Sequence, residues 1–418
     1  MKFFTKKHIF LLFFVAFALF SVNSFAQLIN LDLLENESVL KDLKSKCTKE
    51  NLLGEGGYKK AYKCIFDEKE SVILAFNNTK ENIKEYFDNN LMFYNKFTEE
   101  QLEANNLVPA FAYSAKEMFL VIKFIGKDFI DTRMQDLGKK YGNKEFCFDE
   151  YFDFLDEYVE KYIDIFLDVV KALEFLHKNK IIHCDVKPDN VLVKYDDIKE
   201  RYVGYLSDFD FVKYNENGSI FTKKRTGTQD FYAQELTITR RYKKMQGNNQ
   251  GNNNDRYFLY SKYIDNYALG EFILDTFFSK TFTNKKFENI CKNKDIYLNY
   301  LNKYLQHLFK LIFEYYHKKE NITIDCNIKI YSDMFYEDVN RLIKLFYKDK
   351  KAFDDECVPA GKIKVIYMSK MAKLVFVLMQ YKPQDRFKLK FLIEELNKIK
   401  ELIEYLKDNS ELEENFEI

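Results

Sequence analysis

The sequence has 418 residues, of which 47% are hydrophobic. This share of apolar side chains is enough to bury a sizeable core, so it excludes a wholly disordered chain. Lysine plus arginine and aspartate plus glutamate each count 65, which gives a formal net charge of +0 at pH 7. A chain without an overall basic field lacks the usual attraction for nucleic acid or an anionic membrane, so we expect neither as a partner.

Residues 1–26 have the pattern of a secretory signal peptide. Lysines precede an apolar run at residues 9–20, and the small residues Ser24 and Ala26 form a cleavage site. The run is shorter than the roughly 20 apolar residues that cross a bilayer, which favours a cleaved leader over an uncleaved anchor. We therefore expect a secreted or exported protein that begins at Gln27 and has no membrane span after cleavage.

The rest of the chain divides into a part with short apolar runs and turn residues and a part with helical patterns. We expect a helix at residues 77–97 in the first part, and helices to dominate from Tyr151 onward. His177 lies on the apolar face of one such helix, which favours a structural role over a catalytic one. The expected segments are a helical lead-in at 27–50, a small lobe at 51–125, a larger lobe at 126–408 with a flexible loop at 247–254 and an insertion at about 281–361, and an acidic tail at 409–418.

The most specific motif is the segment 182–192, which reads Ile-His-Cys-Asp-Val-Lys-Pro-Asp-Asn-Val-Leu. It resembles the catalytic loop H-R-D-L-K-P-x-N-x-L of eukaryotic-type protein kinases. The resemblance makes Asp185 the carboxylate that orients the acceptor hydroxyl and takes its proton. Lys187 then neutralises charge on the transferred phosphoryl group, and Asn190 offers an oxygen to the metal. Cys184 replaces the family's arginine, so activation by phosphorylation of the activation segment is not expected, and we expect a small buried side chain here.

Further motifs follow in the family's order. The segment 206–210, Leu-Ser-Asp-Phe-Asp, resembles the D-F-G element, with Asp208 as the Mg²⁺ carboxylate and Asp210 in place of the glycine. Residues 226–235 resemble the segment that ends in A-P-E, residues 265–270 the start of the central helix, and residues 382–387 the late P-x-x-R element. The resemblance implies an ion pair between Glu235 and Arg386.

This resemblance covers about residues 51–406 and implies a fold of the α+β class. We expect a bilobal protein kinase-like fold, with a small β-rich N-lobe and a large α-helical C-lobe that contains an insertion. The hinge between the lobes is expected at residues 123–126, after an apolar strand.

The glycine-rich segment 54–62 departs from the family pattern G-x-G-x-x-G-x-V at two positions. Lys59 replaces the third glycine, and Ala61 replaces the valine. The strand at 72–76 places Ala75 where the family has its ATP-binding lysine. The helical glutamate that pairs with that lysine falls near Asn90, unless a gap brings Glu85 into register. The ATP-binding residues implied by the resemblance are Gly54, Gly56, Gly57, Lys59, Ile122 and Phe124.

Two interpretations of Lys59 stay open. In the with-no-lysine kinases, a lysine at this position of the flap replaces the missing strand lysine, and Lys59 is similarly placed. A long cation can reach the phosphates from either strand because only its charge near them matters. Alternatively, Lys59 is an ordinary surface lysine and the domain is a pseudokinase.

The expected function is that of a secreted serine/threonine protein kinase, which transfers the ATP γ-phosphoryl group to a protein substrate with Mg²⁺ as cofactor. Lys187 followed by Pro188 matches the serine/threonine pattern rather than the tyrosine one. The first alternative is a secreted pseudokinase that acts as a scaffold or allosteric partner. A small-molecule kinase is disfavoured because residues 226–235 resemble the segment that holds a peptide in protein kinases.

Overall fold

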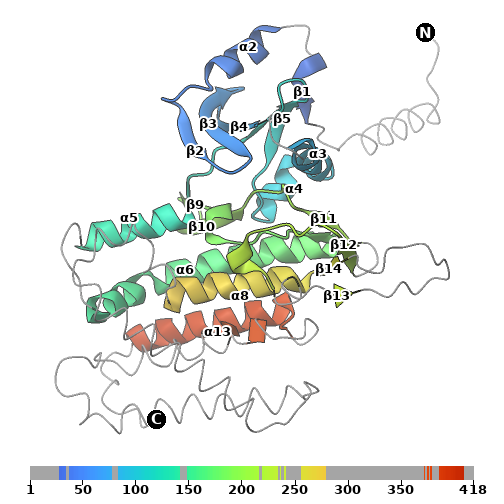
Figure 1. Cartoon of the computed structure of the whole chain (residues 1–418). Helices are drawn as coiled ribbons and strands as arrows, with labels where there is room; N and C mark the ends of the chain where they lie inside the picture. Colours follow the sequence, from blue (N-terminus) through green and yellow to red (C-terminus); the bar gives the residue numbers. More distant parts are fainter. Residues whose placement is uncertain are drawn as a thin grey trace, which may run out of the picture. The chain divides into compact units, whose positions relative to one another are not determined.

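The computed structural model describes most of the chain outside the amino terminus, residues 279–370 and the carboxyl terminus. The described residues are 28–33, 37–77, 83–141, 148–215, 219–233, 236, 240–241, 256–278, 371, 374–375, 377–378 and 386–408. They fall into two compact units (Figure 1). Unit 1 comprises residues up to Gly126 together with Tyr205–Val212, and unit 2 comprises Lys127–Gly204 and the residues from Lys213 onward.

Unit 1 is built on a six-stranded sheet with the order β1-β5-β6-β4-β3-β2. The strands are β1 (Ile29–Asn30), β2 (Leu52–Glu55), β3 (Lys59–Phe66), β4 (Lys69–Phe76), β5 (Ala110–Ser114) and β6 (Phe119–Lys123). Only the pair β1–β5 is parallel among them. A tight turn joins β3 to β4, and both turn residues, Asp67 and Glu68, have positive φ, as a two-residue hairpin requires.

Helices and one 3₁₀ turn complete unit 1. They are η1 (Leu31–Leu33), α2 (Glu37–Ser45), α3 (Ile83–Tyr94) and α4 (Glu99–Ala104). A reciprocal capping box between Thr98 and Gln101 fixes the start of α4. Leu31 and Leu43 pack with Ile73 and Val121 in one buried cluster, which fastens the amino-terminal segment to the sheet.

The expectation of a helical lead-in at 27–50 was wrong in part. Only α2 is an α-helix there, because Ile29 and Asn30 pair with Ala112 and Tyr113 of β5 and extend the sheet by one strand. A strand of two residues is too short to show an alternating pattern in the sequence. Backbone pairing at the edge of the sheet therefore decides its conformation here, rather than the helical pattern of the surrounding residues. The helix expected at 77–97 exists as the shorter α3.

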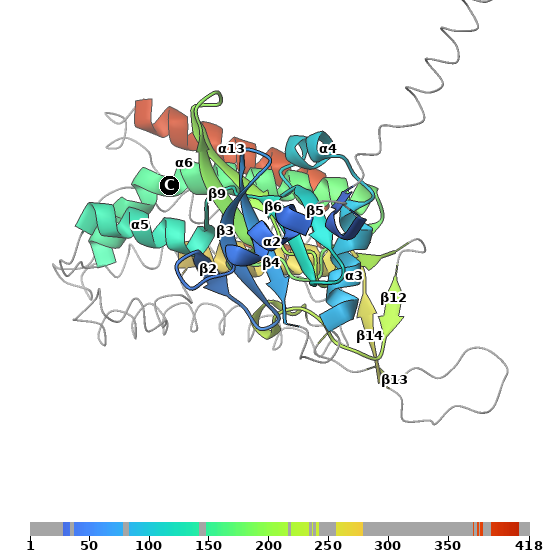
Figure 2. The same ribbon diagram turned by 90° about the horizontal axis from the view of Figure 1, so that it is seen from above.

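Unit 2 consists mainly of helices. They are α5 (Phe129–Tyr141), α6 (Phe148–Lys178), α8 (Tyr263–Phe278) and α13 (Leu389–Asp408), and α6 lies against both α8 and α13 (Figures 1 and 2). The rings of Phe129 and Phe166 both meet Phe272 of α8 edge to face, at 4.9 and 5.0 Å between centroids. Such contacts fix the relative orientation of the three helices in the core.

Short strands support the loops of unit 2. They are β7 (Lys127–Asp128), β8 (Ile181–Ile182), β9 (Val191–Asp196), β10 (Arg201–Leu206), β11 (Lys213–Tyr214), β12 (Ile220–Thr222), β13 (Arg240–Arg241) and β14 (Arg256–Tyr260). They form three small sheets with the orders β10-β9-β7, β11-β8 and β12-β14-β13.

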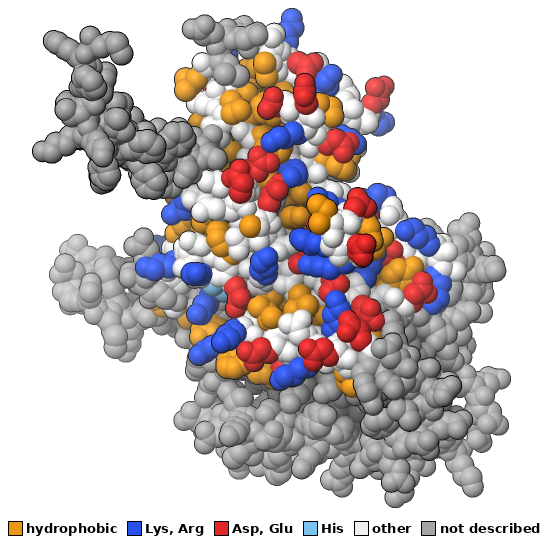
Figure 3. Space-filling model, turned by 180° about the vertical axis from the view of Figure 1, so that it is seen from behind, with side chains coloured by type: hydrophobic (Ala, Val, Ile, Leu, Met, Phe, Trp, Pro, Cys, Tyr) orange, Lys and Arg blue, Asp and Glu red, His pale blue; other side chains and the backbone are white. Residues whose placement is uncertain are grey.

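A β-rich unit and a helical unit confirm the expected bilobal α+β fold. The expected leader at 1–26, loop at 247–254, insertion at about 281–361 and tail at 409–418 lie outside the described residues. None of the helices in the described part of the chain is both long and apolar enough to cross a bilayer. Acidic and basic side chains are mixed on the face shown in Figure 3, in line with the balanced composition.

Candidate functional site

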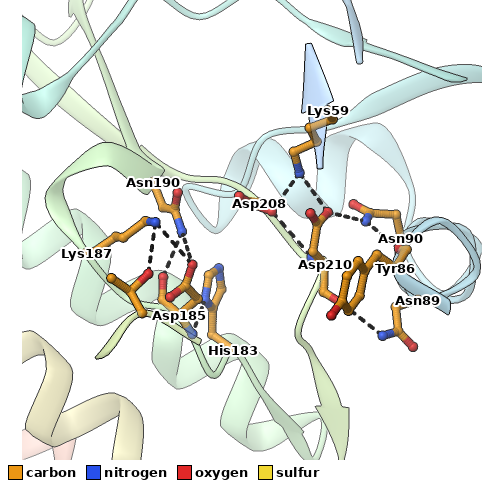
Figure 4. A network of polar contacts seen from close by, with 11 residues as sticks. Lys59, Tyr86, Asn89, Asn90, His183, Asp185, Lys187, Asn190, Asp208 and Asp210 are labelled. Atoms are coloured by element: carbon orange, nitrogen blue, oxygen red, sulfur yellow. Dashed lines mark hydrogen bonds and ion pairs between the residues drawn. The ribbon is translucent and has the colours of Figure 1, made fainter. Parts of the chain in front are cut away.

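The residues singled out in the sequence form two groups of polar contacts, one in each unit (Figure 4). In unit 1, Lys59 Nζ donates hydrogen bonds to Asp208 Oδ1 and to Asp210 Oδ1, each at 2.7 Å. These three residues form the lysine–carboxylate cluster. The Lys59 side chain is only 15% exposed, so it is not an ordinary surface lysine.

The backbone around Phe209 places both carboxylates of this cluster on the same side. Phe209 is fully buried and stacks on Phe93 of α3, with 3.8 Å between ring centroids. Asp208 has a φ of 68°, a left-handed conformation that costs energy for a residue with a side chain. Such strain is typical of functional sites, because the surrounding structure must hold it.

The charges in this cluster depend on one another. Burial disfavours the charged form of Lys59, but the attraction of Asp208 and Asp210 outweighs it and raises the pKa of Lys59. Lys59 is therefore a cation at neutral pH. Burial and the nearby charge of Asp208 raise the pKa of Asp210 to about 7, although Lys59 and a hydrogen bond from Asn90 act in the opposite direction.

Helix α3 contributes amides to the cluster. Asn90, at the expected position of the helical glutamate, donates from Nδ2 to Asp210 Oδ1 at 2.7 Å and to the Tyr86 carbonyl at 2.8 Å. Asn89 Nδ2 donates to the backbone carbonyl of Asp210 at 2.9 Å. Sequence reasoning treated Asp210 only as a lost glycine. The sequence carries a sign of this role: an aspartate replaces the glycine of the D-F-G element in a chain whose helix lacks the usual glutamate.

The neighbouring lysine of β3 lies on the other face of the sheet. Lys60 pairs in register with Ala75 of β4, and its Nζ lies 3.1 Å from Glu55 Oε1 in an exposed ion pair. Successive side chains of a strand point to opposite faces, so Lys59 alone of the two reaches the carboxylates. Residues directly opposite each other in an antiparallel pair share a face, so Ala75 lies on the face of Lys60, and the expectation that it stands at the place of the strand lysine was wrong. The β4 residues on the face of Lys59 at this end of the strand are Leu74 and Phe76, and neither is a cation.

The glycines of the flap leave room next to its backbone. A side chain at Gly54 or Gly57 would meet no atom within 4 Å, and the Gly56 N–H donates to the Lys59 carbonyl at 2.9 Å. Packing within unit 1 therefore does not require glycine at 54 or 57. Backbone that lies open in this way is what close approach of a phosphate needs.

The other two ATP-binding residues expected from the resemblance lie at the end of β6. Ile122 is buried in the sheet, where it pairs with Val72 and Ala110. Phe124 follows the strand, and its backbone N–H donates to the Glu70 carbonyl at 3.1 Å.

In unit 2, the catalytic-loop residues surround one carboxylate. Asn190 Nδ2 donates to the Asp185 carbonyl at 2.8 Å and to Asp185 Oδ2 at 3.1 Å. Lys187 Nζ lies 3.5 Å from the same Oδ2 and donates to Thr228 Oγ1 at 3.0 Å. Asp185 Oδ1 is buried and has no hydrogen-bond partner among the described residues. The carboxylate is thus held by one oxygen, and the other has unused acceptor capacity.

Asp265 at the start of α8 holds the backbone of this loop. Its carboxylate accepts hydrogen bonds from the N–H groups of His183 and Cys184, both at 2.9 Å, and its Oδ2 lies 2.8 Å from His177 Nε2. His177 is therefore structural, as expected. Cys184 is buried, and burial raises the pKa of its thiol well above the usual value, which makes the thiol unreactive.

The segment after the D-F-G-like element packs closely against this loop. Gly227 has a φ of 105°, and a side chain there would lie 2.4 Å from the Cys184 carbonyl oxygen, so only glycine fits. Tyr232 Oη donates to the Gly227 carbonyl at 2.9 Å. A small hollow beside Asp185 is lined in part by Thr228 and Tyr232.

The expected ion pair of Glu235 with Arg386 cannot be described, because Glu235 lies outside the described residues. Arg386 is buried, donates from Nη1 to the Tyr263 carbonyl at 2.8 Å, and lies over the Tyr267 ring.

The residue types at the two expected metal positions fit Mg²⁺. Asp208 offers a carboxylate and Asn190 an amide oxygen, and Mg²⁺ prefers oxygen ligands. Because Asn190 turns its Nδ2 toward Asp185, the oxygen of the amide is on its other side. Mg²⁺ usually takes one or two protein carboxylates together with phosphate and water, and a small donor set suits it.

A lysine of β3 bound to the D-F-G-like aspartate, and a loop aspartate held by the lysine and asparagine that follow it, are the arrangement expected of a protein kinase domain. The chain belongs to the protein kinase domain family, which it matches over residues 47–398. It is similar to eukaryotic serine/threonine protein kinases, which confirms the resemblance inferred from the motifs.

Relatives with known names match over short segments. The chain is 38% identical over 76 residues to Aurora kinase of Candida glabrata, which covers 18% of this chain and 19% of that protein. It is 38% identical over 83 residues to serine/threonine-protein kinase PRR1 of Saccharomyces cerevisiae, over 17% of this chain and 16% of the relative. A match to inhibitor of nuclear factor kappa-B kinase subunit beta of Mus musculus has 33% identity over 75 residues, 18% of this chain and 10% of that protein. The chain thus spans less than a fifth of each relative.

Proposed function

We propose that this protein is an active, exported serine/threonine kinase that transfers the γ-phosphoryl group of ATP to hydroxyl groups of a protein substrate. The observation that carries this proposal is the contact of Lys59 with Asp208. In active kinases, a lysine near the α- and β-phosphates and the D-F-G aspartate must both be in place. Here a lysine on a different strand meets that aspartate.

In unit 1, Lys59 would neutralise charge on the phosphates, and the flap glycines would let the backbone approach them. Asp208 is the carboxylate of unit 1 that would hold Mg²⁺, and Asn190 is the expected amide-oxygen donor of unit 2. When bound, the metal supplies positive charge next to the β- and γ-phosphate oxygens.

In unit 2, Asp185 would accept the proton of the substrate hydroxyl. Its Oδ1 has no other partner among the described residues, while Asn190 and Lys187 hold the rest of the carboxylate. Lys187 also reaches Thr228, which links the catalytic loop to the segment that holds the peptide in related kinases. The Lys187–Pro188 pattern favours serine or threonine as the acceptor.

A secreted pseudokinase remains the second candidate because β4 places no cation opposite Lys59, where Phe76 lies, and because Asn90 stands at the expected position of the helical glutamate. The two candidates differ in phosphoryl transfer, which only an active site with a working cation performs. Export itself is proposed from the sequence pattern of residues 1–26.

The decisive experiment compares lysine variants at neighbouring positions. Lys59→Met should lower phosphoryl transfer from labelled ATP by at least about 10²–10³-fold, because it removes charge stabilisation at the phosphates. Lys60→Met should stay within about twofold of the wild type, since this exposed side chain faces away from the cluster. Asp185→Asn should abolish turnover but still bind Mg·ATP in a thermal-shift assay, because its role is to position the acceptor.

Nucleotide binding without transfer by the wild type, with a range of serine and threonine peptides, would favour the pseudokinase. Transfer that survives Lys59→Met would reject the mechanism in which this lysine replaces the strand lysine.

A further inference from the structure

Helix α3 reaches the lysine–carboxylate cluster through a neutral side chain. Asn90 stands where related kinases have the glutamate that pairs with the strand lysine. Its Nδ2 points to Asp210 Oδ1 at 2.7 Å (Figure 4). An amide can orient a carboxylate by donating a hydrogen bond, but it cannot balance the charge of Lys59.

Asp210 supplies the missing charge. Its Oδ1 accepts hydrogen bonds from Lys59 Nζ and from Asn90 Nδ2, and its side chain is 3% exposed. The backbone carbonyl of Asp210 also accepts from Asn89, so two successive amides of α3 hold this residue. A glycine at position 210, as in the D-F-G element, would remove the acceptor that Lys59 and Asn90 share.

Asp208 alone is poorly suited to keep Lys59 in place. It is the proposed metal ligand, and a divalent cation beside it would repel the Lys59 ammonium and compete for the same carboxylate. A second carboxylate, held by α3, keeps an anchor for Lys59 that does not depend on the state of Asp208.

We propose that Asp210 is the positioning residue for Lys59, and that Asn90 holds the Asp210 carboxylate. The pair then replaces the lysine–glutamate pair of related kinases, with both members at new positions in the chain. This inference deepens the proposed function and rests on it, since Lys59 must contact the phosphates for the position of its side chain to matter in catalysis.

The pairing can be tested without nucleotide, by thermal unfolding of the whole chain. Lys59→Met should lower Tm by about 5 °C or more, because it leaves two carboxylates together in a buried site. Adding Asp210→Asn should restore part of this loss, since the uncompensated charge is removed. The matched control is Lys60→Met, whose effect should simply add to that of Asp210→Asn. If the effects of Lys59→Met and Asp210→Asn on Tm also simply add, the proposed pairing of Lys59 with Asp210 is wrong.

Catalysis gives the second test. Asp210→Asn and Asp210→Gly should each lower kcat/KM for ATP by about 10–100-fold, and neither should have a further effect in the Lys59→Met background. Moving the acid to the helix, as Asn90→Glu together with Asp210→Gly, should recover about tenfold of the loss. If Asp210 has only a structural role, its substitution should lower kcat/KM equally in the wild-type and Lys59→Met backgrounds, and moving the acid to position 90 should recover none of the loss. If the wild type transfers no phosphate, the proposed function fails, while the thermal cycle still decides the pairing.

Discussion

Asp32 ties the amino-terminal segment to the sheet of unit 1 through three hydrogen bonds. Its carboxylate accepts from Ser114 Oγ at 2.5 Å and from the backbone N–H groups of Ala115 and Lys116 at 2.8 and 3.0 Å. Partial burial raises the pKa of Asp32, but the hydrogen bonds outweigh this and lower it below its ordinary value. The folded protein therefore favours the ionised carboxylate.

This shift predicts how the contribution of Asp32 depends on pH. A folded pKa below the unfolded value of about 3.9 gives stability that is present above pH 4 and is lost as the pH falls through the folded pKa. Asp32→Asn should therefore lower Tm by a few degrees at pH 7. The difference from wild type should shrink as the pH falls below about 4.

The control is Asp88→Asn, which removes an exposed i,i+4 partner of Lys84 on α3 and should barely change Tm. A difference between Asp32→Asn and wild type that stays constant from pH 7 to the acid limit would show that the charge of Asp32 has no part in its role.

The sequence predicted the contacts of the catalytic loop but not those of the lysine–carboxylate cluster. Asp185, Lys187 and Asn190 lie within one short loop, so their contacts follow from local spacing, and the structure brings them together. The pair of Lys59 and Asp210 joins positions 151 residues apart. No local pattern specifies such a contact, and a family pattern with glycine at position 210 hides it.

At the scale of elements, the segment after Asp208 is held by strand pairing. Strand β12 pairs with β14, with Ile220 opposite Tyr260. The buried Tyr260 Oη accepts hydrogen bonds from the Thr226 N–H at 2.6 Å and from Thr226 Oγ1 at 3.1 Å. In related kinases, an arginine before the catalytic aspartate gathers a phosphate on this segment. Cys184 cannot do so, and these strand contacts hold the segment without a phosphate.

This arrangement predicts that one hydroxyl matters for the segment. Tyr260→Phe leaves the buried Thr226 N–H without its acceptor, which should cost about 1–3 kcal/mol of unfolding free energy. We expect a lower Tm and reduced phosphoryl transfer, because Thr226 precedes Gly227 and Thr228, which contact the catalytic loop. Denaturant unfolding and the labelled-ATP assay measure both effects.

Tyr195→Phe, at an exposed position of β9, is the matched control and should change neither quantity. Unchanged stability of Tyr260→Phe would show that the Thr226 N–H finds another acceptor, and the proposed support of the segment would be wrong.

The elements of the fold were predictable to different degrees for physical reasons. Long amphipathic helices such as α6 have a pattern of many residues, and the sequence indicates them well. The two-residue strand β1 and the pairing of β12 with β14 depend on partners far along the chain, so composition and periodicity carry no sign of them.

At the scale of the whole molecule, the proposed leader must end before the fold begins. Leu28 is buried, with 7% of its surface exposed, and β1 follows it directly. Cleavage after Ala26 would leave Leu28, β1 and Asp32 in the mature protein. A cut only a few residues later would remove part of the sheet.

The mature chain 27–418 should therefore have a higher Tm than a shorter chain that begins at Glu37. The shorter chain loses the buried side chains Leu28 and Leu31, and burial of one such leucine contributes about 1.5–3 kcal/mol. It also loses the three hydrogen bonds of Asp32. Thermal unfolding of the two purified chains measures the difference, and amino-terminal sequencing of exported protein checks the start at Gln27. Equal Tm values would show that β1 adds nothing to the sheet, and recovery of residues 1–26 on exported protein would refute the cleavage.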